Sequence, residues 1–183
     1  MKQTGVIPAG NEWVENDIRE FAGSPAARIG DEWMLITAGD VSGDKGNWNT
    51  MTASWGGLGV LWGKNVAFMF IRNTRHTLEF ANAASLFSLS FFDKPFHKAL
   101  EIAGAKSGRD IDKAKEGGLT PIVFSDGSLG FKEAKEVISC RKLYAHDFDP
   151  ALFVDKTIDP KIYPQKDYHR MYIGEITKLR VKG

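Results

Sequence analysis

Apolar residues in this chain alternate with polar ones or cluster in short runs, a pattern typical of β-strands. Residues 33–38 alternate and carry the β-branched pair Ile36 and Thr37. Residues 66–71 are apolar on both faces, as expected of a strand in a closed or two-sided sheet. Further strands are predicted at residues 49–55, 86–92, 121–124, 129–131, 136–148 and 171–179.

Three segments have the composition of helices. Residues 74–84 contain several alanines and one apolar stripe, and they begin at Thr74, whose side chain can accept a hydrogen bond from a free amide. Residues 95–103 start with a proline, which suits a first helical turn. Residues 110–116 are predicted to form a short third helix.

Strands therefore outnumber helices, and their lengths and spacing are too uneven for a regular α/β repeat. The pattern predicts a mainly β protein with peripheral helices, arranged as a β-barrel with the helices packed on its outside. Glycine-rich turns are expected at residues 39–47 and 56–59.

A single domain is expected, because 183 residues with 43% hydrophobic side chains can bury one substantial core. Residues 1–30 are predicted to be an N-terminal extension that packs on the barrel. Residues 149–165 hold several prolines and little periodicity, which predicts a long ordered loop rather than a linker. Within residues 149–170 this loop could form a lid.

Charge and cysteine content exclude several classes of function. Lys and Arg number 24 against 23 for Asp and Glu, so no global field favours nucleic acid. No apolar run approaches the roughly 20 residues that span a bilayer, and we expect a cytoplasmic protein without membrane contact. The single Cys140 and four widely spaced histidines give no basis for a disulfide or a metal site. The glycines of residues 56–63 match neither a P-loop nor a dinucleotide fingerprint.

Two guanidinium groups and two hydroxyls are concentrated where a predicted strand gives way to a predicted helix. They belong to Arg72, Thr74, Arg75 and Thr77. Guanidinium groups donate paired charge-assisted hydrogen bonds to phosphate, and the first amides of a helix are unpaired. This segment is a candidate phosphate site. The alternative is a solvated turn in which Thr74 only caps the helix.

Residues 49–55 supply small polar side chains beside tryptophans at positions 48, 55 and 62. A flavin ring needs both kinds of contact, because its pyrimidine edge carries hydrogen-bonding groups and its faces need flat apolar cover. The alternative is a strand whose outward face is Thr50, Thr52 and Ser54, since period-two alternation alone gives that pattern.

Four ordered motifs carry a resemblance to a known family. They are Asn-x-Met-Thr-Ala-Ser-Trp-Gly-Gly from residue 49, Arg-x-x-Arg-x-Thr from residue 72, residues 107–113, and residues 167–176. Together they resemble the flavin reductase-like family, and its flavoredoxin branch in particular, over roughly residues 33–179. The resemblance implies an FMN-binding split β-barrel that is typically a homodimer, with FMN near the subunit interface.

The resemblance also implies roles for individual residues. The flavin ring would be lined by Asn49, Thr50, Met51, Thr52, Ala53, Ser54 and Trp55. The phosphate would be held by Arg72, Thr74, Arg75 and Thr77, and Arg109 and Lys113 would also lie close to the cofactor. Asn73 departs from the family, whose members often have proline there. His169 is a candidate catalytic residue beside a nicotinamide site, although Tyr168 separates it from Asp167; the alternative is a structural histidine.

The function implied is an FMN-dependent oxidoreductase that passes electrons from NADH or NADPH, through the flavin, to a small-molecule or protein acceptor. The sequence does not separate NADH from NADPH. Three alternatives remain open: a non-catalytic electron carrier that keeps FMN bound, an oxidase of the pyridoxamine phosphate oxidase type, and an interaction module without flavin. Fold analogy cannot decide among them, because function resides in the site.

Overall fold

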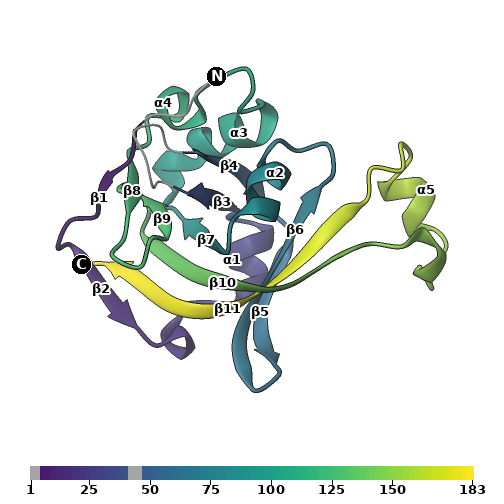
Figure 1. The fold of residues 1–183 in the computed structure, drawn as a ribbon, viewed down its shortest axis with the longest axis horizontal. Helices are drawn as coiled ribbons and strands as arrows, with labels where there is room; N and C mark the ends of the chain where they lie inside the picture. The colour runs from purple at the N-terminus through teal and green to yellow at the C-terminus, as the bar shows by residue number, and fades with distance from the viewer. Residues whose placement is uncertain (1–4, 41–46) are drawn as a thin grey trace.

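The computed structural model describes residues 5–40 and 47–183 of the chain. One large antiparallel sheet holds eight strands and curls around the core (Figure 1). In sheet order its strands are β4 (Asn47–Ala53), β3 (Met34–Asp40), β7 (Leu86–Phe91), β10 (Glu136–Asp147), β11 (His169–Lys182), β6 (Lys64–Arg72) and β5 (Gly56–Leu61), while β2 (Trp13–Asn16) pairs with β11. The predicted mainly β class is confirmed.

A second, small sheet joins the N-terminal segment to the barrel. It contains β1 (Ile7–Pro8), β8 (Pro121–Val123) and β9 (Leu129–Phe131), with β1 parallel to β8. The helices lie around the large sheet (Figure 1): α1 (Pro25–Gly30), α2 (Thr77–Ala83), α3 (His97–Ala105), α4 (Lys113–Gly117) and α5 (Ile158–Ile162), with 3-10 turns at Ile18–Glu20, Lys94–Phe96 and Pro150–Leu152. None of the described helices combines the length and apolar character needed to cross a membrane.

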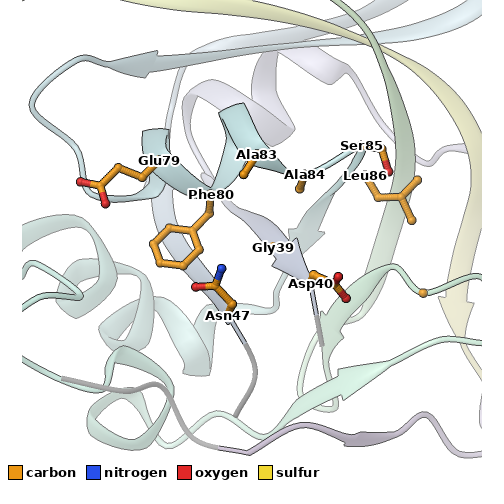
Figure 2. A pocket seen from close by; sticks show the side chains of 10 residues that line it. Gly39, Asp40, Asn47, Glu79, Phe80, Ala83, Ala84, Ser85 and Leu86 are labelled. Atoms are coloured by element: carbon orange, nitrogen blue, oxygen red, sulfur yellow. The ribbon is translucent and has the colours of Figure 1, made fainter. Parts of the chain in front are cut away.

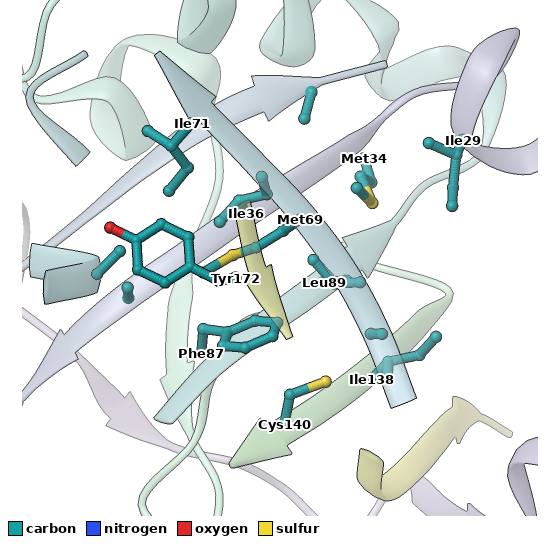
Figure 3. Close-up of a cluster of buried hydrophobic side chains, with 14 of the residues drawn as sticks. Ile29, Met34, Ile36, Met69, Ile71, Phe87, Leu89, Ile138, Cys140 and Tyr172 are labelled. Atoms are coloured by element: carbon teal, nitrogen blue, oxygen red, sulfur yellow. The ribbon is translucent and has the colours of Figure 1, made fainter. Parts of the chain in front are cut away.

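The core fills the inside of the large sheet, because alternate residues of each strand point to the same face. Ile36, Met69, Leu89, Ile138 and Tyr172 come from five strands and are fully buried together (Figure 3). Cys140 belongs to the same cluster, and burial raises the pKa of its thiol far above the usual range, so it is part of the core and unreactive.

A second buried cluster lies between the outer face of the large sheet, helices α3 and α4, and the small sheet. Its largest fully buried side chains are Trp48 and Phe131, followed by Leu35 and Leu100. Trp48 precedes the site segment of β4, so this cluster fixes that strand from the side opposite the first cluster.

The strand β10 runs on beyond β7 and stays paired with β11 up to Asp147, and α5 lies beyond this end of the pair (Figure 1). The register shifts between Ser139 and Cys140 and again between Lys142 and Tyr144. Such bulges increase the local bend and twist of a strand pair. Opposite them, an added Cβ at Gly174 would lie 2.4 Å from the Phe87 ring, so this close approach requires glycine. We call residues 148–168, beyond the paired strands, the arm.

Most predicted strands are present, and the differences have local causes. The predicted glycine turn at residues 56–59 is wrong: these residues form β5, and the turn falls at Trp62 and Gly63, both with positive φ. A Cβ at Gly56 would meet Met34 and the Phe68 carbonyl, so the glycines allow close packing rather than a turn. Of the loop predicted at residues 39–47, residues 41–46 lie outside the described residues.

Two of the three predicted helices begin later than their sequence patterns, and the helix predicted at residues 95–103 is present as α3, shifted to His97–Ala105 behind a 3-10 turn. The helix expected at residues 74–84 begins only at Thr77. The helix expected at residues 110–116 begins at Lys113, where the Asp112 side chain accepts a hydrogen bond from the Lys115 amide. Residues 149–165 contain a 3-10 turn and α5, and the lid role predicted for residues 149–170 stays a prediction.

Candidate functional site

A cavity of about 250 Å³ lies where the end of β4, the end of β6 and the start of β11 meet. Its lining residues are Met51, Thr52, Ala53, Ser54, Trp55, Phe70, Arg72, Arg75 and His169. Among them Phe70 alone was not predicted from the sequence. The strand register explains the grouping, because Arg72 and His169 are paired residues on β6 and β11 and such pairs place their side chains on one face.

Arg72 ends β6 and is held by the arm. Its Nη1 donates to the Asp167 carboxylate at 2.5 Å, and its Nη2 donates to the Ile162 carbonyl at 3.1 Å. The guanidinium also lies 5.3 Å from the centre of the Tyr163 ring. The side chain keeps 30% of its surface exposed. Because a guanidinium carries five N–H groups, these contacts leave donors that can face a ligand in the cavity.

Arg75 follows in the turn after β6 and is held by the carboxyl end of α3. It donates to the carbonyls of Gly104 at 2.7 Å and Ala103 at 3.4 Å. A helix carboxyl end favours a cation there. Burial lowers the pKa of Arg75 below its usual value, and the charge of Arg72 lowers it further. Two guanidinium groups that repel one another line one cavity, and an anion between them would relieve that repulsion.

The turn between Arg72 and α2 differs from the predicted helix start. Thr74 does not cap the helix; the cap position is His76, whose side chain makes no capping bond. The amides of Leu78 and Glu79 are taken by the carbonyls of Arg75 and His76. Within the described part of the chain, the amides of Thr74 and His76 have no backbone acceptor. The amides without a backbone acceptor next to Arg72 and Arg75 therefore lie in a turn rather than in the first turn of the helix that the sequence suggested.

Three of the predicted cofactor residues stand behind the cavity wall. Asn49, Thr50 and Thr77 are fully buried. Asn49 donates from Nδ2 to the Thr77 hydroxyl at 3.1 Å, which ties β4 to α2. The Thr50 hydroxyl donates to the Ile36 carbonyl at 3.0 Å. A Cβ at Gly108 would lie 2.3 Å from Asn49 Oδ1, so the segment before α4 packs directly on this side chain. These residues fix the wall that Met51–Trp55 present to the cavity.

Lys113 also supports this wall from behind. It is 3% exposed and donates to the Thr50 carbonyl at 2.8 Å and the Ala103 carbonyl at 2.9 Å. Arg109, four residues earlier, is instead exposed and forms an ion pair with Glu79 on α2. Lys113 reaches the site through the backbone of β4 and α3, whereas the Arg109 charge acts on His76 in the turn before α2, where it lowers the pKa of that histidine after the larger effect of burial.

The burial of Lys113 can be tested through the pH dependence of protein stability. Burial, followed by the charge of Arg75, lowers the pKa of Lys113 to about 7, against about 10.4 in an unfolded chain. Between these two pKa values Lys113 is protonated in the unfolded chain but neutral in the folded one, so the free energy of unfolding rises with pH across that window. Below about pH 7 the side chain is protonated in both states, and the folded protein bears the full cost of burying an ammonium group. In urea unfolding without flavin, we expect this rise to be smaller in Lys113→Met than in the natural protein. An identical pH dependence of the two proteins would contradict it.

His169 begins β11 and is 7% exposed. Its Nδ1 lies 2.9 Å from the Tyr163 hydroxyl, and its ring lies 4.8 Å from the Trp55 ring. Burial lowers the pKa of His169 to about 4, with a further lowering by Arg72. The histidine is therefore neutral near pH 7. Tyr163 and the pairing of Asp167 with Arg72 were missed from the sequence, since both depend on how the arm folds back on β6.

A larger cavity of about 610 Å³ lies elsewhere, between α2 and the ends of β3 and β4 (Figure 2). Asp40 and Glu79 are among its lining residues, and its described lining contains no lysine, arginine or histidine. Two carboxylates repel an anionic ligand. The smaller cavity is therefore the better candidate, although it is not the largest.

An apolar cavity of about 450 Å³ adjoins the candidate site. It shares Ser54, Trp55 and Phe70 with it and continues to Phe148 and to Ile29 on α1. No charged side chain is among its described lining residues. The two cavities together offer a cationic end and a flat apolar end, which suits a ligand with a phosphate and a ring.

Comparison with known proteins agrees on the fold. No protein-family model matches the chain, and no curated protein matches it in sequence. Among solved structures, flavoredoxin of Desulfovibrio vulgaris is 20% identical with a TM-score of 0.62, covering 82% of this chain and 69% of its own. An FMN-binding domain of a flavin reductase-like enzyme from Shewanella baltica is 12% identical with a TM-score of 0.65, covering 95% and 79%.

A protein with a split barrel domain from Shewanella frigidimarina is 19% identical with a TM-score of 0.63, covering 86% of this chain and 72% of its own. At these identities the likeness concerns the fold. The predicted split-barrel architecture, and with it the resemblance to flavoredoxin and flavin reductase-like proteins, is confirmed at that level.

Proposed function

We propose that this chain is an FMN-dependent oxidoreductase that passes electrons from NADH or NADPH, through the flavin, to an acceptor. One observation carries the proposal: Arg72 and Arg75 share a cavity with the wall Met51–Trp55, so a phosphate site and a ring site adjoin. The fold shared with FMN-binding proteins supports the choice of flavin.

The donor set suits the phosphate of FMN. The two guanidinium groups provide charge-assisted hydrogen bonds, and the free amides of Thr74 and His76 lie in the turn between β6 and α2. Trp55 is 43% exposed beside the cavity and offers a flat face for a ring. We assign the ring contacts to residues 51–55, with Asn49, Thr50, Thr77 and Lys113 fixing the wall from behind.

Bound FMN supplies the redox chemistry, namely acceptance of a hydride and donation of electrons. The chain itself binds and orients. Its side chains place the ring against a wall held by buried hydrogen bonds, and the adjoining apolar cavity beside Phe70 and Phe148 offers further flat apolar surface for the ring and for a second flat molecule next to it. The catalytic role predicted for His169 stays a prediction.

The proposal includes a homodimer and a cytoplasmic location. Val60, Trp62 and Tyr144 are large apolar side chains that are 73%, 59% and 43% exposed, and a second copy could cover them. The single cysteine is buried, which fits a reducing compartment. Light scattering after size exclusion would give the oligomeric state directly.

The test is an absorbance spectrum of the purified protein with added FMN, followed by anaerobic addition of NADH or NADPH. We expect bound flavin whose absorbance bleaches with one or both nicotinamides. A protein that takes up no FMN would refute the proposal. Bound flavin that neither nicotinamide reduces would indicate the electron carrier, and oxygen consumption without a nicotinamide would indicate the oxidase.

A further inference from the structure

The contact between Tyr163 and His169 is set by the arm. Tyr163 follows α5, is 2% exposed, and packs among Arg72, His169 and Tyr168. Its hydroxyl lies 2.9 Å from Nδ1 of His169. The histidine ring also packs against Trp55, with 4.8 Å between the ring centres. The ring is thus held between two aromatic side chains from distant parts of the chain, and it lines the cavity that holds Arg72 and Arg75.

The direction of this hydrogen bond follows from the surroundings of the Tyr163 oxygen. Among the described residues, the hydrogen-bond partner of the Tyr163 hydroxyl is Nδ1 of His169. If Nδ1 carried a proton, it would donate to the Tyr163 oxygen and the hydroxyl proton would be left without this acceptor, whereas an unprotonated Nδ1 accepts that proton. A buried hydroxyl without an acceptor would be costly, and within the described residues Nδ1 is the acceptor beside it.

The charges around the histidine oppose its protonation. Arg72 on β6 faces it directly and Arg75 lines the same cavity, while Asp167 on the arm has the opposite effect but is paired with Arg72. Tyr163 stays protonated because burial raises the pKa of its hydroxyl. A neutral histidine that accepts at Nδ1 carries its one proton on Nε2.

We propose that Tyr163 is a positioning residue that fixes His169 as a neutral Nε2–H donor, and that this donor joins Arg72 and Arg75 in binding an anionic oxygen of the ligand. The tautomer is a property of the chain alone. Its use toward the phosphate of FMN rests on the proposed function. In this arrangement His169 binds through a hydrogen bond rather than through charge.

The tautomer is tested by ¹⁵N NMR of histidine-labelled protein without ligand. We expect His169 to give the pattern of a single neutral Nε2–H tautomer from about pH 5.5 to 8, well above its pKa of about 4. His169→Gln identifies the signal by its loss, and His97→Gln on the exposed start of α3 serves as the control. In Tyr163→Phe we expect a mixture of tautomers and a higher pKa for His169. A protonated Nδ1 in the natural protein, or an unchanged spectrum in Tyr163→Phe, would overturn the proposal.

The ligand role is tested by binding of FMN and of riboflavin, which lacks the phosphate. Gln can present an N–H near the position of Nε2, whereas Asn reaches only the position of Nδ1. We expect His169→Asn to weaken FMN binding about tenfold more than His169→Gln does, the size of one hydrogen bond. Riboflavin binding should not separate the two variants. Equal FMN affinities of the two variants would refute the donor role, whereas absence of FMN binding in the natural protein would refute the proposed function itself.

Discussion

Replacement of both Arg72 and Arg75 by alanine is expected to weaken FMN binding by about 10²- to 10⁴-fold. Each guanidinium can form a charge-assisted hydrogen bond to phosphate worth about 1.5–3 kcal/mol, so two contribute about 3–6 kcal/mol. Both side chains line the same cavity. Quenching of flavin fluorescence on titration gives the affinity, and the loss should be far smaller for riboflavin, because riboflavin has no phosphate.

A matched control removes the same charge elsewhere. Arg19 and Arg141 are exposed and pair with Asp17 and Glu175 away from the cavity, so Arg19→Ala with Arg141→Ala should leave FMN affinity unchanged. Arg72→Ala also leaves Asp167 without its partner, so the variant could lose structure as well as binding. Thermal unfolding of each variant measures any loss of structure, and the double variant Arg72→Ala with Asp167→Asn removes the unpaired carboxylate. Natural affinity in a folded Arg72 and Arg75 double variant would contradict the phosphate assignment.

Arg28→Ala should cost about 3–5 kcal/mol of stability, because it leaves a buried carboxylate without its partner. Arg28 on α1 lies 2.5 Å from Glu136 at the start of β10, with side chains only 6% and 4% exposed. Its guanidinium also lies 5.1 Å from the ring centres of Phe21 and Phe91. This contact attaches the N-terminal segment to the barrel. Urea unfolding measures the loss.

Two further variants show whether the loss of stability comes from the buried ion pair. Arg28→Met with Glu136→Leu removes both charges and should lose less stability than Arg28→Ala, because no buried charge is left alone. Arg19→Ala, which breaks an exposed pair with Asp17, should show no measurable loss. If Arg28→Ala were no worse than Arg19→Ala, the pair would contribute nothing to attaching α1.

Local patterns in the sequence were sufficient for most strands, because side chains on a strand alternate between core and solvent. These local patterns gave wrong predictions where the packing of neighbouring segments determines the backbone conformation. The glycines of residues 56–59 suggested a turn, yet they form β5 because small residues fit against Met34 and Phe68. The start of α2 moved to Thr77 because the carbonyls of the preceding turn take its first amides.

The candidate site likewise has a part that the sequence predicted and a part that it did not. The wall at residues 51–55, both guanidinium groups and His169 lie in continuous motifs, and the fold brings them to one cavity. Tyr163, and the pairing of Asp167 with Arg72, could not be predicted, because Arg72 is about 90 residues away from both and the contacts depend on the arm. Lys113 was predicted as a cofactor contact, but its burial behind β4 depends on α3 and could not be predicted from its motif.

The contacts of Arg72 with the arm have a thermodynamic consequence. The guanidinium that faces the cavity also holds Asp167 and the Ile162 carbonyl. A ligand that draws Arg72 toward itself competes with these arm contacts, and linkage requires the reverse effect to have the same size. Occupancy of the cavity and docking of the arm are therefore coupled equilibria, and a substitution in the arm can change affinity without touching the ligand.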